Sequence, residues 1–116
     1  MIFPANWAEQ WIGAWNRLDL EALLSLYAEN IQLRSPFAKV YARDGTIKGK
    51  GELRTYWGEA MRRIPNLNLE LVAVYSGHMA LALHYRENNS RNVIESVMFD
   101  EQDKVVFETA CLDRVR

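Results

Sequence analysis

Two glutamates in the C-terminal half of the chain are the side chains best placed for proton transfer. Glu95 alternates with Val93, Val97 and Phe99, so in a β-strand its carboxyl group shares a face with apolar side chains. Glu108 lies in a second alternating segment of the same kind. Two carboxyl groups close together in an apolar setting have pKa values that move apart, which lets one act as an acid and the other as a base. Glu95 and Glu108 are therefore the candidate catalytic residues.

Both glutamates also have an ordinary structural interpretation. A single glutamate in a strand more often faces solvent or pairs with a surface cation than it performs chemistry. The polar neighbours Thr109 and Asp113 favour partial exposure for Glu108. The sequence leaves open whether either carboxyl group is catalytic, and whether the two share one site.

The histidines and glycines give no sign of a metal or a nucleotide. His78 and His84 lie six residues apart, unlike the spacing of about four residues that places two histidine ligands on one helix face. Gly45, Gly49 and Gly51 form neither a dinucleotide-binding pattern nor a P-loop. We expect no metal and no cofactor.

Two helices are expected to open the chain. Over residues 6–17, large apolar side chains recur at spacings of three and four, which predicts a helix. Asn6 and Glu9 have the spacing of a capping box, so we expect them to begin this helix. Asp19 has the same N-cap character and predicts a second, short helix whose buried face includes Tyr27.

The middle of the chain predicts a strand, a loop and a third helix. Alternation over residues 31–35 predicts a short strand, which Pro36 ends because proline has no N–H to donate. Residues 37–50 show no period and contain glycines, so we expect a mobile loop that covers the mouth of a pocket. Helical spacing returns over residues 53–64 and stops at Pro65.

The last half of the chain is expected to consist of strands. They are predicted at residues 67–75, 79–86, 91–99 and 105–112, with short connections that imply an antiparallel meander. This order of elements predicts an α+β fold in which three helices pack on one face of a strongly curved sheet. A chain of 116 residues, 49% of them hydrophobic, has the size of one domain covering residues 1–116.

The same order of elements, with the segments AWNRLDLEALLSLYAENIQL, IKGKGELRTYW and IESVMFDEQDKVV, resembles the nuclear transport factor 2-like superfamily, and within it the SnoaL-like and ketosteroid-isomerase-like branch. The resemblance covers nearly the whole chain. It implies a cone-shaped fold in which a strongly curved antiparallel sheet wraps around three N-terminal-half helices and encloses a deep central pocket. Members are isomerases, cyclases, epoxide hydrolases, dehydratases or non-catalytic binding proteins, so the fold does not decide the function.

The resemblance also argues against two of the family's activities. At the position of the general-base aspartate of ketosteroid isomerases the chain has Ser35, and at the position of their phenol donor it has Trp11. The third component, a carboxylic acid on a strand, is matched by Glu95. The arginine of the epoxide hydrolases corresponds to Val93. We therefore expect neither steroid isomerisation nor epoxide hydrolysis, because the groups that would move the protons are missing.

The pocket that the resemblance implies would be lined mainly by apolar and aromatic side chains. We expect ligand contacts from Trp11, Trp15, Leu33, Ser35, Phe37, Tyr56, Trp57, Leu83, Val97 and Phe99. The helical aromatics among them could equally be plain core, because aromatic stripes at helical spacing usually are. The predicted ligand is a small apolar or carboxylate-bearing molecule. The chain would then be a binding protein, or an isomerase, cyclase or hydrolase-like enzyme that uses acid–base chemistry without a cofactor.

The remaining expectations concern partners and location. Fourteen basic and fifteen acidic residues give a net charge of -1, which argues against nucleic acid or an anionic membrane as a partner. The N-terminal segment lacks the pattern of a signal peptide, and Cys111 is the single cysteine, so we expect a cytoplasmic protein. The alternative to an enzyme is a non-catalytic, homodimeric protein-interaction module. Apolar side chains on the outer sheet face predict a homodimer through that face: Val72, Val74, Ala80, Ala82, Ile94, Met98, Val105 and Phe107.

Overall fold

The computed structural model describes residues 1–113, which form helices and strands in the predicted order. The elements are α1 (Pro4–Asn16), α2 (Leu20–Leu24), β1 (Tyr27–Arg34), the 3₁₀-helix η1 (Pro36–Val40), β2 (Thr46–Lys48), α3 (Lys50–Arg63), β3 (Leu69–Gly77), β4 (Ala80–Glu87), β5 (Arg91–Phe99) and β6 (Val105–Leu112). None of the helices in this range combines the length and the apolar character needed to cross a membrane.

The six strands of the described range form one sheet in the order β2–β1–β6–β5–β4–β3. Strands β3 to β6 follow one another as the predicted antiparallel meander. Strand β1 pairs parallel to β6 on one side and antiparallel to β2 on the other. The prediction of an α+β fold is confirmed. The prediction of an entirely antiparallel sheet is wrong, because β1 and β6 are parallel. A parallel pair needs a long crossover, and the chain from β2 to β5 supplies it.

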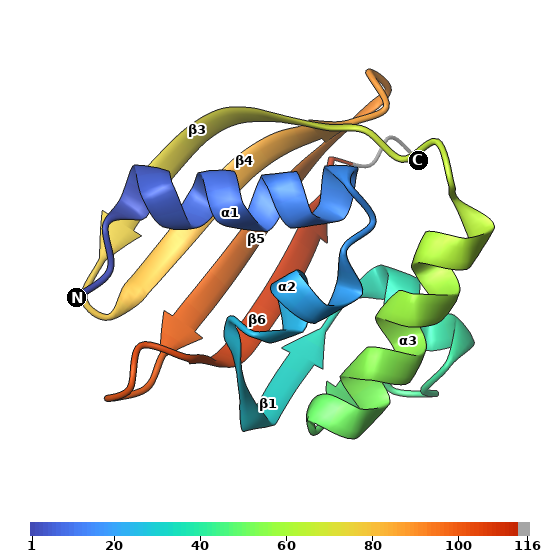
Figure 1. The fold of residues 1–116 in the computed structure, drawn as a ribbon. Helices are drawn as coiled ribbons and strands as arrows, with labels where there is room; N and C mark the ends of the chain where they lie inside the picture. Colours follow the sequence, from blue (N-terminus) through green and yellow to red (C-terminus); the bar gives the residue numbers. More distant parts are fainter. Residues whose placement is uncertain (114–116) are drawn as a thin grey trace.

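The helices and one face of the sheet form the core between them. Helix α1 packs against the β3 end of the sheet, and α3 packs at the β1 and β2 end (Figure 1). Burial alternates along β4 and β5, with Leu81, Leu83, Val93 and Val97 on the buried face. This alternation is typical of an antiparallel sheet that is covered on one side. Side chains on that inner face are the ones that can meet residues of the helices.

The first helix begins two residues earlier than the sequence predicts. Pro4 occupies its first turn, where the fixed φ of proline suits a helix and the missing N–H is not needed. The N-cap position is Phe3 and no side chain caps the helix, so the predicted capping box of Asn6 and Glu9 is wrong. The second helix starts as predicted, because Asp19 Oδ1 accepts a hydrogen bond from a backbone N–H of its first turn at 3.1 Å.

Tyr27 belongs to β1 and not to the second helix. Helix α2 ends at Leu24, and Tyr27 pairs with Val105 of β6 as the first residue of the strand. The apolar spacing that continues the helix pattern to Tyr27 is local, whereas pairing with β6 gives the backbone of Tyr27 and of residues 32–34 partners in a sheet. The Tyr27 side chain is buried as a result, with its hydroxyl group inside the protein.

The segment predicted as a mobile loop contains two short regular elements. The 3₁₀-helix η1 follows Ser35, which caps it: Ser35 Oγ accepts a hydrogen bond from the Phe37 N–H at 3.1 Å. Residues 46–48 pair with β1 as β2. Elements this short leave no periodic signal in the sequence, which explains why both were missed. Residues 41–45 connect the two elements.

Two residues expected on the outer face of the sheet lie on its inner side. Val74 pairs with Leu83 across β3 and β4, and Val105 is completely buried. A bulge between Leu71 and Ala73 shifts the alternation of β3 by one residue. A similar irregularity where β5 pairs with the start of β6 accounts for Val105.

Replacing Asp19 with alanine is expected to lower the free energy of unfolding by about 1 kcal/mol, because the first turn of α2 loses its N-cap acceptor. The matched replacement Asn6→Ala, at the residue that the sequence suggests as a cap, should change it by less than about 0.5 kcal/mol. Urea denaturation followed by circular dichroism measures both values. Equal losses for the two variants would contradict the role of Asp19.

Candidate functional site

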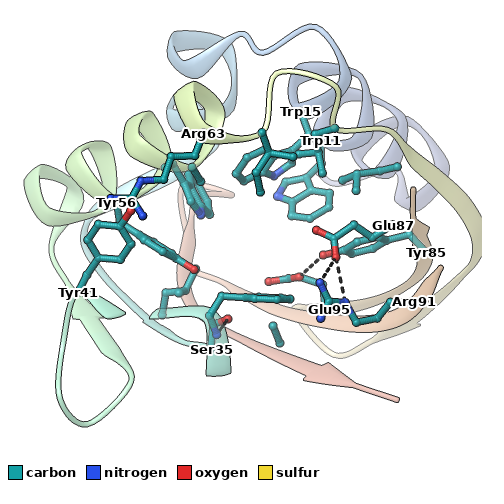
Figure 2. A pocket seen from close by; sticks show the side chains of 18 residues that line it. Trp11, Trp15, Ser35, Tyr41, Tyr56, Arg63, Tyr85, Glu87, Arg91 and Glu95 are labelled. Atoms are coloured by element: carbon teal, nitrogen blue, oxygen red, sulfur yellow. Dashed lines mark hydrogen bonds and ion pairs between the residues drawn. The ribbon is translucent and has the colours of Figure 1, made fainter. Parts of the chain in front are cut away.

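A cavity of about 290 Å³ is lined by residues of α1, α3 and the inner face of the sheet (Figure 2). Of the predicted ligand contacts, the structure brings these to the cavity wall: Trp11, Trp15, Leu33, Ser35, Phe37, Tyr56 and Trp57. Glu95 lies on the wall with them (Figure 2). The volume is at the lower end of the range for small-molecule pockets, which begins at about 300 Å³.

Three predicted contact residues are not part of the cavity wall. Leu83 and Val97 are completely buried in the core, and Phe99 packs edge-on against Trp7 with the ring centroids 5.4 Å apart. All three belong to the inner face of the sheet, as their alternation predicts. Side chains of α1 cover that part of the face, so these residues pack against protein and not against the cavity.

The cavity wall also contains polar residues that the sequence analysis did not identify. Tyr85 and Glu87 come from the end of β4, Arg91 from the start of β5 and Arg63 from the last turn of α3 (Figure 2). A signal for Arg91 was present, because alternation places it on the same face of β5 as Glu95. Alternation along β4 likewise places Glu87 on the same face as Tyr85. For Arg63, nothing local distinguishes a cavity residue from a solvated helix end.

The histidines are not part of the cavity wall. His84 Nε2 lies 2.9 Å from Asn92 Oδ1, on the neighbouring strand. Within residues 1–113, no three histidine, cysteine, aspartate or glutamate side chains are grouped so that they could hold a metal ion.

Glu95 is held at the cavity wall by a tyrosine of the neighbouring strand. Its side chain is 6% exposed, and the Tyr85 hydroxyl donates a hydrogen bond to Glu95 Oε1 at 2.8 Å. Burial disfavours the charged form and raises the pKa of Glu95, while hydrogen bonds from Glu108 and Tyr85 oppose this rise. The charge state of Glu95 therefore depends on the protons that its partners donate.

Glu108 is completely buried, although its neighbours in the sequence favoured partial exposure. Strand β6 lies in the middle of the sheet between β1 and β5, so water is excluded from both sides of this residue. The Tyr27 hydroxyl donates a hydrogen bond to Glu108 Oε1 at 2.5 Å, and Trp11 Nε1 donates to the Tyr27 oxygen at 2.8 Å. A chain of hydrogen bonds thus joins α1, β1 and β6.

The two glutamates are diagonal neighbours on adjacent strands and titrate as a pair. Glu95 is opposite Ala110 in the β5–β6 register, two residues from Glu108 on the same face. Burial, and then the negative charge of Glu95, raise the pKa of Glu108 well above its ordinary value. Glu108 Oε2 is buried and has no hydrogen-bond partner within residues 1–113. The rise is the stronger one for Glu108, so the pair favours a proton on Glu108 over one on Glu95.

An α+β fold of this topology is that of the NTF2-like proteins with a ketosteroid-isomerase-like fold. Within this class, the family model of the SnoaL-like domain matches residues 8–99. The chain belongs to the SnoaL-like family. No curated protein sequence matches it.

Solved structures agree with this assignment. A SnoaL-like protein of unknown function from Burkholderia thailandensis E264 is 34% identical with a TM-score of 0.89, over 96% of this chain and 95% of that chain. A candidate isomerase of the SnoaL-like family from Agrobacterium tumefaciens C58 is 15% identical with a TM-score of 0.77, over 95% and 97%. A protein with a ketosteroid-isomerase-like fold from Catenulispora acidiphila, in complex with trimethylamine, is 11% identical with a TM-score of 0.74, over 94% and 86%. The last two show a similarity of fold alone.

Replacing Glu108 with glutamine should change how stability depends on pH. Glutamine keeps an acceptor for Tyr27 and a donor for Glu95 but cannot titrate. The raised pKa of Glu108 stabilises the wild-type fold at acidic pH, and this contribution is lost as the pH rises from the ordinary value of 4.5 towards the pKa of the folded protein. The free energy of unfolding of the wild type, relative to that of E108Q, is therefore expected to fall as the pH rises from about 5 into the alkaline range.

Urea denaturation across this pH range measures the difference. Glu101→Gln, at an exposed position, is the control and should leave the pH dependence of the wild type unchanged. A difference between wild type and E108Q that stays constant with pH would show that Glu108 is not the protonated member of the pair.

Proposed function

We propose that this SnoaL-like protein binds a small apolar molecule in the cavity and isomerises it by acid–base catalysis without a cofactor. The observation behind the proposal is the Glu95–Glu108 pair, which puts a buried carboxyl group of raised pKa, with a second one beside it, at an otherwise mainly apolar wall. Isomerisation fits best, because one group that removes and then returns a proton needs no further reagent.

The carboxyl pair can accept a proton without placing a new charge in the core. Glu95 takes a proton from a carbon next to a substrate carbonyl and becomes a neutral acid, and the carbonyl oxygen gains the electron pair as an enolate. Glu95 then returns the proton to a different carbon, so the product is an isomer and the pair regains its starting state. Burial raises the pKa of both glutamates, which keeps the neutral pair accessible.

The polar atoms of Ser35 and Trp11 do not replace the missing parts of a ketosteroid isomerase. Trp11 Nε1 donates its proton to Tyr27, and Ser35 Oγ accepts from the Phe37 N–H at the start of η1. Both polar groups therefore already form hydrogen bonds within the protein. This supports a substrate and a proton-transfer geometry different from those of the steroid isomerases.

In this proposal the sheet wraps around the helices as a cone, and the cavity is its deep central pocket. Trp57 packs edge-on against Trp15 and Tyr27, with ring centroids 5.3 and 5.0 Å apart. Such a wall offers a substrate apolar surface and few hydrogen bonds. The open volume supports small-molecule binding over a protein-interaction module, since a purely structural core is close-packed with side chains.

Hydrogen exchange next to a carbonyl tests the proposal without knowledge of the natural substrate. In D₂O, the protein should accelerate exchange of the α-protons of small cyclic ketones such as 2-tetralone, as followed by proton NMR. Glu95→Gln should reduce the acceleration by about 100-fold or more, the usual contribution of a general base. Glu101→Gln, at an exposed position, should leave it unchanged.

Binding and chemistry are separated by the same variant. Glutamine keeps the shape of Glu95, so ketone binding measured by thermal shift should survive in E95Q. Retained binding with lost exchange is the expected result. Equal exchange by wild type and E95Q, or an ordinary pKa for Glu95 in a carboxyl NMR titration, would contradict the catalytic role.

We also propose that two copies of the chain pair through the outer face of the sheet. Apolar side chains on this face include Tyr75, Ile94 and Met98, which are 61%, 39% and 49% exposed. Phe107 lies beside Met98 in the β5–β6 register. Contiguous apolar surface of this kind is unusual on a monomer, and a twofold copy of the same face would cover it.

Light scattering at micromolar concentration is expected to give about twice the chain mass of 13.5 kDa. Replacing Ile94 and Met98 together with lysine should give the monomer mass, because both lysines would lie in the interface. Thr55→Lys, at an exposed position on α3, is the control and should remain dimeric. A monomer mass for the wild type would reject this assembly.

A further inference from the structure

The cavity wall contains a cation, Arg91, that is held by several contacts and that the proton transfer does not use. Arg91 donates from Nε and Nη2 to the same oxygen, Glu87 Oε1, at 3.1 and 2.9 Å (Figure 2). Its guanidinium group also lies over the ring of Phe37, 4.8 Å from the centroid. These contacts come from two directions and hold the guanidinium group in one orientation at the cavity.

Arg91 keeps hydrogen-bonding capacity for a ligand. A guanidinium group has about five N–H donors, and within residues 1–113 the hydrogen bonds of Arg91 account for one on Nε and one on Nη2. The donors on Nη1 and the second one on Nη2 remain. The side chain is 39% exposed, half-buried beside an aromatic ring. Donors in such a place favour a carboxylate, whose two oxygens fit the planar fork.

Arginine side chains gather at this end of the cavity. Arg62 and Arg63 at the end of α3 share the carboxylate of Glu59, and Arg91 pairs with Glu87. Three arginines and two glutamates leave one positive charge in this group. Arg63 lies on the cavity wall together with Arg91 and Glu87. With Glu95 as a carboxylate the charges on the wall itself sum to zero, so an anion would be held by the free donors of Arg91 and not by a net charge.

The spacing along β5 allows one small molecule to reach both Arg91 and Glu95. The two residues lie on the same face of the strand, with Val93 between them. Four residues of a strand separate their Cα atoms by about 13 Å, and both side chains line the same cavity. A ligand with an anionic end and an apolar body can therefore occupy the space between the two groups.

We propose that the substrate is an apolar carboxylic acid whose carboxylate binds Arg91, while its body lies along the aromatic wall and presents a carbon to Glu95. This inference rests on the proposed function and names the substrate class of the same cavity. The carboxylate is a binding handle and takes no part in the proton transfer. It fixes which carbon of the substrate reaches Glu95.

Titration calorimetry with matched acids and amides tests this inference. The probes are 3-phenylpropionate, 4-phenylbutyrate and 5-phenylpentanoate, each compared with its neutral amide. At least one acid should bind about tenfold or more tightly than its amide. Arg91→Met should abolish this preference, and Arg91→Lys should retain part of it. Arg86→Gln, which removes an exposed arginine of β4, is the matched control and should leave the preference intact.

Two further variants separate the parts of the site. Glu87→Gln removes the competing carboxylate, so the acids should bind more tightly while the amides are unaffected. Glu95→Gln should keep the preference for acids, because the handle is at Arg91. If the protein did not accelerate exchange of the ketone α-protons, the proposed chemistry would be overturned, but the preference for acids over amides would still stand.

Three outcomes would overturn the inference. They are equal affinities of acid and amide for the wild-type protein, the absence of acid binding at millimolar concentration, and an unchanged preference in folded Arg91→Met. Because the first two are measured on the wild-type protein, they decide the matter even where a variant fails to fold. Salt gives a further check, since the preference for the acid should shrink as sodium chloride is added.

Discussion

Two carboxyl groups buried side by side are the constraint on which the rest of this structure depends. A buried carboxylate without partners costs several kcal/mol, so Glu95 and Glu108 need donors close to them. Tyr85 supplies one from β4, and Tyr27 supplies another from β1 with Trp11 behind it on α1. The positions of α1 and β1 against the central strands are therefore tied to the carboxyl pair.

The same pair places an ionisable group at the wall of a mainly apolar cavity. Glu108 is sealed in the core with a raised pKa, whereas Glu95 lies at the wall, where the proposed function gives it the proton transfer. Arg91 is on the same strand, with its charge directed to the cavity by Glu87 and Phe37. One strand thus presents a carboxyl group and a guanidinium group to a single cavity, which aromatic residues of the helices also line.

Local patterns in the sequence predict most of the fold and one part of the site. Helical and strand periods locate the elements, and alternation along β5 puts Glu95 on the inner face. The same alternation could have identified Arg91. The errors fall where the pattern is short or interrupted: the elements within residues 36–48 are too brief to show a period, and a bulge in β3 turns Val74 inward.

The sequence by itself determined the order of the elements, the α+β class and the inner position of Glu95, because each depends on periods read over neighbouring residues. Only the tertiary structure decided that β1 pairs parallel to β6 and that Glu108 is sealed beside Glu95. Tyr27 lies 81 residues from Glu108 in the chain, and Trp11 lies 16 residues from Tyr27. No local period reports such pairings, since they arise when a parallel crossover brings distant strands together.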